Sequence, residues 1–189
     1  VVSTGLRHRD KPFQGPLDWR VLVEWLSHDG IITPAEDERT ITRCSAGASA
    51  QPPLQRLSVV GMARASDGAT LTLDALSEWL ASHLGMDYLR IDPLKVDVGK
   101  VADTMSASYA ERHKVLPVQV TLKEVVVATA EPFITDWVGE VERQARRPVR
   151  RVLTNPLDIH RYTVEFFALA KSVRAAQKSG GQSATSNFE

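Results

Sequence analysis

The stretch VLPVQVTLKEVVVAT, residues 115–129, decides the fold of this chain of 189 residues. It contains two runs rich in valine and leucine, 115–120 and 122–129, which are separated only by Thr121. Two β-type runs this close in sequence predict a hairpin. Pro117 has no backbone N–H to donate, so the first run belongs at an edge of the sheet or near the start of a strand. We therefore expect a small sheet built around this hairpin.

The segment that follows the hairpin predicts one more strand between two helices. Thr135 is a suitable N-cap for the first helix, and residues 148–153 have the composition of a strand. Asn155 before Pro156 is typical of a helix start, because the Asn side chain caps the first turn and Pro fits its first position. The buried face of that last helix is predicted from apolar residues at helical spacing, namely Ile159, Tyr162, Phe166 and Ala170.

The segment that precedes the hairpin is mainly helical in pattern. Residues 101–113 are expected to be a helix, and residues 88–91 a short strand. Between Leu17 and Leu84 the apolar residues recur at helical spacing, with glycines that end the helices. We predict an α+β fold: an N-terminal helical module, followed by a small α/β module with a short three- to four-stranded mixed or antiparallel sheet flanked by helices.

Composition divides the chain into four segments. Residues 1–16 mix Gly, Pro and charge without periodicity and are expected to be a disordered leader. Residues 17–85 form the helical subdomain and residues 86–172 the α+β subdomain. Residues 173–189 become rich in Ser, Gly, Ala and Gln, which is typical of a flexible linker. A linker leads to something, so we expect the chain to be a fragment of a longer protein.

Charge and cysteine content exclude several classes of protein. Lys+Arg and Asp+Glu both number 23, so the net charge is zero and the basic surplus of a general nucleic-acid binder is absent. The single cysteine, Cys44, cannot form an intramolecular disulfide, which favours a reducing, cytoplasmic setting. The sequence has neither a membrane-spanning run nor a signal-peptide pattern, so we expect no direct membrane insertion.

The sequence also lacks the motifs of common catalytic sites. It contains no G-x-x-x-x-G-K-[ST] phosphate-binding loop and no G-x-S-x-G nucleophile motif. The five histidines do not have metal-ligand spacing. We therefore predict no catalytic residue, no metal site and no enzyme activity in this fragment. An unfamiliar enzyme site using Asp87, Asp92 and Asp97 is the alternative, although such aspartates more often serve turns and helix starts.

One basic cluster is a candidate partner-binding surface. It consists of Arg143, Arg146, Arg147 and Arg150, with Arg151 next to them. Guanidinium groups recognise carboxylates and phosphates by paired hydrogen bonds, so the cluster suits an acidic partner. A solvated helix end is the alternative interpretation.

Five short motifs give the chain a family resemblance. They are, in chain order, LGMDYLRIDPLKVD at 84–97, YAERHKVLP at 109–117, VVVATAEP at 125–132, RPV at 147–149 and NPLDI at 155–159. In this order and spacing they resemble the N-terminal domain of type II secretion and type IV pilus assembly ATPases, over roughly residues 73–167.

The resemblance implies a regulatory and docking domain. It implies that ATP and Mg²⁺ bind in a C-terminal ATPase core outside this fragment, and that the parent protein is hexameric. It also implies a place at the cytoplasmic face of the inner membrane, with the cytoplasmic domain of an inner-membrane secretion or pilus assembly protein as partner. The domain's own C-terminal ATPase core would be its second partner.

Some members of the family, of the MshEN type, bind cyclic di-GMP, and this is the alternative function. Aligned on the turn at Gly30 and Ile31, the family motif places Val21 where an arginine belongs and Val23 where a glycine belongs. Loss of the arginine removes a charge-assisted phosphate contact, and Arg20 is the nearest substitute. The residues that the resemblance implies for this ligand are Arg20, Leu22, Gly30, Ile31, Leu54 and Gly61.

Overall fold

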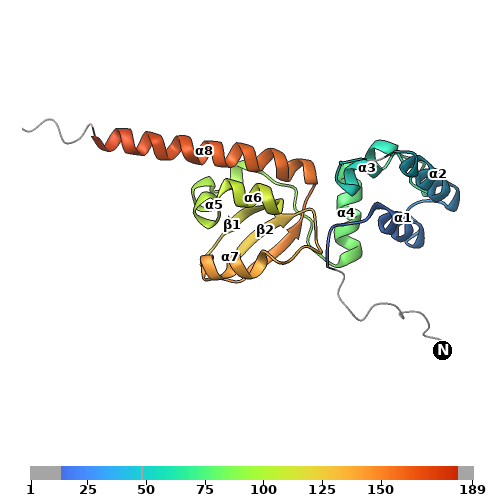
Figure 1. The fold of residues 1–189 in the computed structure, drawn as a ribbon, viewed down its shortest axis with the longest axis horizontal. Coiled ribbons are helices and arrows are strands. Elements are labelled where there is room, and N and C mark those ends of the chain that lie inside the picture. Colours follow the sequence, from blue (N-terminus) through green and yellow to red (C-terminus); the bar gives the residue numbers. More distant parts are fainter. Residues whose placement is uncertain (1–13, 48, 183–189) are drawn as a thin grey trace, which may run out of the picture.

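A computed structural model describes residues 14–47 and 49–182 as a helical half followed by a sheet-containing half (Figure 1). The helices of the first half are α1 (Trp19–His28), α2 (Pro34–Ser45), α3 (Pro53–Val60) and α4 (Leu73–Leu84). The second half contains a 3₁₀ turn (Pro93–Lys95), α5 (Val98–Thr104), α6 (Ala107–His113), β1 (Val115–Val120), β2 (Val125–Thr129), α7 (Val138–Ala145), β3 (Val149–Leu153) and α8 (Pro156–Gln182).

The helices of the first half begin and end at residues suited to those positions. The Thr33 hydroxyl accepts a hydrogen bond from the Glu36 N–H at the start of α2, and Pro34 occupies the first helical position. Gly85 ends α4 in the left-handed region, with φ of 64°. Leucines on the inner faces of α1, α3 and α4 meet Cys44 of α2 in one core, in which Leu22, Leu57, Leu76 and Leu80 are fully buried.

The sheet has the strand order β1-β2-β3 and is mixed. β1 pairs antiparallel with β2 through the predicted hairpin, and β2 pairs parallel with β3. The β1–β2 register shifts between Pro117 and Gln119, so the proline lies at an irregularity of an edge strand. The predicted fold class, α+β with a short mixed sheet flanked by helices, is confirmed.

Helices cover both faces of the sheet and also its β1 edge. α8 packs on one face through Ile159, Tyr162 and Phe166, and α7 packs on the other (Figure 1). α5 and α6 extend around β1, because Val101 lies in the core under α8 while Met105 lies in the core under α7. An edge covered in this way is protected from pairing with another strand.

Two elements that precede the hairpin differ in extent from the prediction. The expected strand at 88–91 is one bridge, Tyr88 to Leu153, because the chain turns away at Asp92 and Pro93. The expected helix at 101–113 is two helices, interrupted by Met105 in an extended conformation, and Ser106 caps the second.

The start of α7 also differs from the prediction. α7 begins at Val138 rather than directly after Thr135. Trp137 precedes it as the N-cap residue; the Trp137 side chain is buried, and its Nε1 donates to the Ile134 carbonyl at 2.9 Å. Burial of the indole, rather than a threonine cap, therefore decides where this helix starts.

The structure describes only part of the predicted leader and of the predicted linker. α8 continues through Gln182, so the first part of the predicted linker at 173–189 is helical rather than irregular. The physical reason is that Arg, Ala, Gln and Lys, which fill residues 174–178, have high helix propensity. Residues 1–13 and 183–189 lie outside the described residues, as do most of the predicted leader and the end of the predicted linker.

The halves meet through both apolar and polar contacts. Leu153 of β3 is buried in the helical core, and Phe133 packs against the same core. Asp74 of α4 accepts hydrogen bonds from Asn155 Nδ2 at 2.9 Å and from the Tyr88 hydroxyl at 3.2 Å. Within residues 14–47 and 49–182, none of the helices combines the length and apolar character needed to span a bilayer.

Candidate functional site

A pocket of about 530 Å³ lies where the two halves meet. Its walls come from the start of α3, the end of α6, the residues after β2 and the start of α8. Most of the lining is apolar, as shown by Leu17, Leu54, Ala110 and Ile159. A largely apolar concavity of this size is typical of a small-molecule or side-chain binding site.

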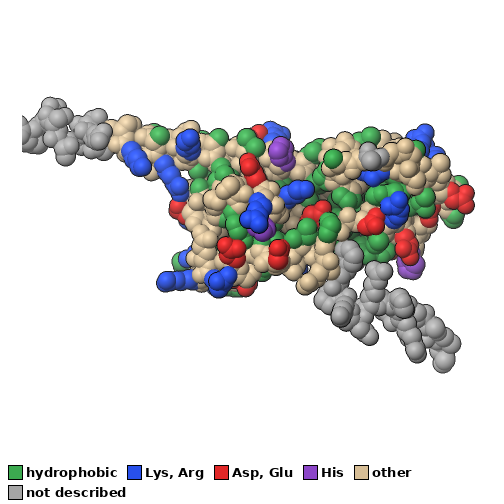
Figure 2. All heavy atoms as spheres, in the orientation of Figure 1, with side chains coloured by type: hydrophobic (Ala, Val, Ile, Leu, Met, Phe, Trp, Pro, Cys, Tyr) green, Lys and Arg blue, Asp and Glu red, His purple; other side chains and the backbone are tan. Residues whose placement is uncertain are grey.

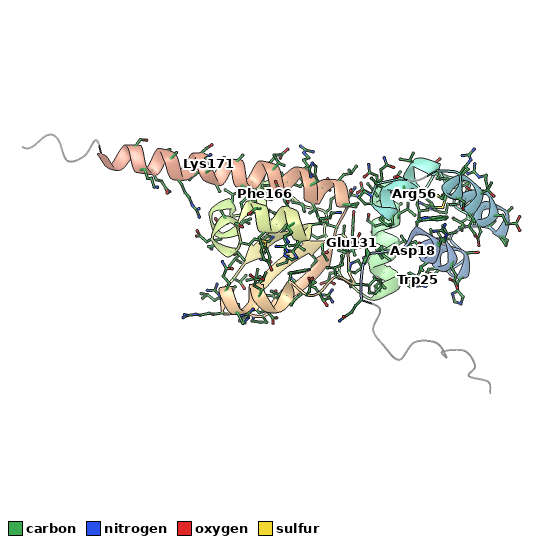
Figure 3. The ribbon with its side chains drawn as sticks, in the orientation of Figure 1. Asp18, Trp25, Arg56, Glu131, Phe166 and Lys171 are labelled. Atoms are coloured by element: carbon green, nitrogen blue, oxygen red, sulfur yellow. The ribbon has the colours of Figure 1, made fainter. Side chains whose placement is uncertain are left out.

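The polar centre of this junction pocket is Glu131, labelled in Figure 3 between the two halves. Its Oε2 accepts the Leu17 backbone N–H at 2.8 Å. Burial raises the pKa of the Glu131 carboxyl, although the Leu17 hydrogen bond and the charge of Lys114 oppose this. The pocket therefore combines an apolar lining with the Glu131 acceptor, and Lys114 and His160 also border it.

The residues predicted for cyclic di-GMP are distributed over both ends of the helical half. Leu22 and Leu54 are core residues, with exposed fractions of 0% and 1%, although Leu54 also borders the junction pocket. Gly30 and Gly61 both have positive φ and form turns. The Ile31 carbonyl accepts the Ala65 N–H at 2.8 Å, which joins the turn after α1 to the loop after α3.

Arg20 lies at the other end of α1 from Gly30 and is exposed. Its guanidinium stands over the Trp19 ring, 4.4 Å from the centroid, and the guanidinium of Arg56 stands 5.1 Å from the same centroid. The structure thus places Arg20 beside a second cation, Arg56, that the sequence analysis missed. The only sequence signal for Arg56 is its position two residues after Leu54, and that signal is weak.

An aromatic cluster joins the C-terminal ends of α1 and α4. Asp29 Oδ2 accepts from Trp79 Nε1 at 2.9 Å and lies 2.7 Å from His83 Nδ1. Burial opposes ionisation of Asp29, but the hydrogen bonds from His83 and Trp79 outweigh it and lower the pKa of Asp29. The His83 ring also stacks on Trp25, with centroids 4.7 Å apart. These contacts fix the packing of α1 on α4.

The basic cluster is only partly kept together by the fold. Arg143 and Arg146 are exposed at the C-terminal end of α7, and Arg147 next to them is half-buried. Arg150 lies on β3 and is ion-paired with Asp87 and Glu124, each at 3.1 Å. Arg150 is also exposed, but its charge is engaged by these two carboxylates, so Arg143 and Arg146 are the exposed cations at the end of α7.

The three aspartates of the alternative enzyme site have structural contacts. Asp92 and Asp97 accept hydrogen bonds from the backbone N–H groups of Leu94 and Lys100, at the starts of the 3₁₀ turn and of α5. Asp87 pairs with Arg150. In the described part of the chain, no group of three or more His, Cys, Asp or Glu side chains is arranged to hold a metal ion.

Comparison with known proteins agrees with this architecture. The model of the MshEN domain family matches residues 84–173. The type IV pilus assembly ATPase TfpB of Acinetobacter baylyi is 34% identical over 105 residues, which are 55% of this chain and 18% of that protein. The chain therefore spans less than a fifth of the length of this relative.

A solved structure shows the same fold at low sequence identity. A structure of MshE with cdg has a TM-score of 0.56 and 14% identity, covering 77% of this chain and 97% of that one. A structure of the N-terminal domain of XpsE has a TM-score of 0.48 and 15% identity, with coverage of 79% and 96%. Residues 84–173 thus match the MshEN domain family, in a chain that is similar to a type IV pilus assembly ATPase over 105 residues.

Proposed function

We propose that this chain is the N-terminal regulatory and docking domain of a type IV pilus assembly or type II secretion ATPase. The observation that carries the proposal is the 34% identity to TfpB over 105 residues. In this proposal ATP hydrolysis belongs to a C-terminal core with its own ATP and Mg²⁺, and the parent protein is hexameric. The domain binds the cytoplasmic part of an inner-membrane assembly protein and couples it to the motor.

The proposed docking surface is the exposed end of α7 with Arg143 and Arg146. Two guanidinium groups at a helix end suit acidic side chains on a partner. Arg147 is half-buried and Arg150 already has two carboxylate partners, so these two are expected to support the surface rather than bind directly.

Isothermal titration with the cytoplasmic domain of the inner-membrane assembly protein from the same apparatus tests the proposal. Binding by the wild-type chain is expected, with at least about tenfold weaker binding after Arg143→Glu with Arg146→Glu, since each charge reversal replaces attraction by repulsion. Arg64→Glu, on the helical half, is the matched control and should bind normally. Normal binding by the double variant would remove this surface, and no binding by the wild-type chain would count against the docking role.

The second candidate function is reception of cyclic di-GMP. The fold match to MshE with cdg favours it, as does the pair of cations, Arg20 and Arg56, on the Trp19 ring. Two observations oppose it: Val23 stands fully buried at the position of the family's glycine, and the junction pocket holds the Glu131 carboxylate. In this candidate the phosphates lie at Arg20 and Arg56, outside the pocket.

Thermal unfolding with cyclic di-GMP, with ATP as the control ligand, tests this candidate. A ligand at 100 times its Kd stabilises the folded state by about 2.7 kcal/mol, which is a clear rise in Tm. Arg20→Ala should abolish the rise and lower the Tm of the free protein only slightly, because Arg20 is exposed and its contact with the Trp19 ring is weak. No rise in the wild-type protein at millimolar ligand would exclude the candidate.

A further inference from the structure

A groove of about 520 Å³ runs between α8 and the point where α5 passes into α6. This groove lies at the start of α6, whereas the junction pocket is lined by Glu111 and Lys114 toward the end of the same helix. Ala102 and Ala107 form one wall, and Ala170 and Phe167 of α8 form the other. The alanines among them are small and allow close approach, and Phe167 adds an aromatic surface.

Three cations of α8 border this groove: Lys171, Arg174 and Lys178. Their spacing of three and four residues places them on one face of the helix. Figure 1 shows that this part of α8 projects past the sheet, and Figure 2 shows Lys and Arg side chains along it. The groove therefore combines an apolar floor with a row of positive charge.

The charge of this row is only partly neutralised within the domain. Arg174 is ion-paired with Asp103 of α5. Among residues 14–47 and 49–182, Lys171 and Lys178 have no carboxylate within ion-pair distance. Two cations thus remain for a ligand of opposite charge.

We propose that this groove binds an acidic helical segment of a partner protein. Carboxylates of the segment would pair with Lys171 and Lys178, and its small or apolar side chains would pack on Phe167 and the alanines. Helix axes approach to about 8 Å only where the contact residues are small, as they are here. The straight, exposed course of α8 offers a helix a parallel wall.

Two other classes of anionic partner fit less well. A lipid surface needs outward apolar side chains at the site, whereas Phe167 and Ala170 lie inside the groove. Exposed apolar residues of α8 such as Val164, Leu169 and Val173 do not line the groove. A nucleic acid requires neutralisation of many phosphates, and two available cations are too few.

Fluorescence anisotropy with a labelled amphipathic helical peptide, with Ala and Leu on one face and Glu on the other, tests the proposal. The wild-type chain should bind it, and binding should weaken as NaCl rises from 50 to 500 mM. Lys171→Glu with Lys178→Glu should weaken binding at least about tenfold. Lys171→Gln with Lys178→Gln should give an intermediate loss.

Arg161→Glu is the matched control, because Arg161 is also an exposed cation of α8 but does not line the groove. It should bind like the wild type, and circular dichroism should show unchanged helix content in every variant. Equal binding by the charge-reversal variant, equal binding of a peptide with Lys in place of Glu, or no binding of the acidic peptide would each overturn the proposal. Binding to phosphatidylglycerol vesicles without binding to the peptide would also overturn it.

Discussion

The two halves of the molecule bury their apolar residues in different ways. In the helical half, each helix contributes one face to a single core, as Leu76 and Leu80 do from α4. In the other half, every residue of β2 is buried: Val125 and Val127 face α7, whereas Val126 faces α8. In the helical half, therefore, the spacing of apolar residues predicts which side chains enter the core. A central strand shows only a continuous apolar run, which does not tell which residue faces which side of the sheet.

The largest expected effect comes from cutting a cavity in either core. Leu57→Ala in the helical core and Leu116→Ala in the sheet core should each lower the free energy of unfolding by about 2–5 kcal/mol, because both leucines are fully buried. Urea unfolding followed by tryptophan fluorescence and by circular dichroism measures the loss.

The same experiment tests whether the halves are one cooperative unit. We expect coincident transitions by both probes, since Leu153 of the sheet half is buried in the helical core. Two separate transitions, with Leu57→Ala shifting only one of them, would show that the halves fold independently.

A smaller effect is expected from cutting the polar contact between the halves. Asp74→Ala removes the acceptor of Asn155 and Tyr88, so it should cost about 1–3 kcal/mol in urea unfolding. Glu165→Ala, which removes only an exposed ion pair with Arg161, is the control and should change stability by less than about 0.5 kcal/mol. Equal effects of the two substitutions would mean that Asp74 does not hold the halves together.

The smallest effect is the pH dependence of Glu131. Its pKa is raised in the folded state, so the folded protein binds this proton more tightly than the unfolded chain. Stability from this group is therefore present at low pH and is lost as pH rises through the folded pKa. Glu131→Gln keeps an acceptor for Leu17 and removes the ionisation.

Unfolding of the wild type and of Glu131→Gln across pH 4 to 8 measures this effect. The stability of the variant relative to the wild type should increase as pH rises above the ordinary glutamate value of 4.5. Taking the difference removes the contribution of other carboxyls such as Asp29. A difference that is flat, or that falls with pH, would show that Glu131 is not destabilised by burial.

Sequence reasoning located most elements because their start and stop signals are local. Thr33 before Pro34, Gly85 after α4, and Asn155 before Pro156 all act within one helical turn. The extent of the strand expected at 88–91 and the start of α7 were wrong, since these depend on a partner strand and on a buried indole. Neither is encoded in neighbouring residues.

The candidate sites show the same difference between local signals and contacts between distant segments. The resemblance to secretion and pilus ATPases comes from ordered motifs and is confirmed by the family and sequence matches. The roles of Arg20, Leu22, Gly30, Ile31, Leu54 and Gly61, and of Arg143, Arg146, Arg147 and Arg150, stay predictions. Arg56 beside Arg20 and the acidic partners of Arg150 were invisible in the sequence, because they join distant segments.

The sequence by itself determined most helices, the hairpin and the family resemblance, because periodicity, caps and short motifs are properties of neighbouring residues. Only the tertiary structure decided that Leu17, Leu54, Glu131 and Ile159 share one pocket, and that Lys171 and Lys178 border a groove beside α5 and α6. The physical reason is that such sites arise from packing between elements far apart in the chain. They form only when the helices and the sheet pack together, and no local sequence pattern predicts them.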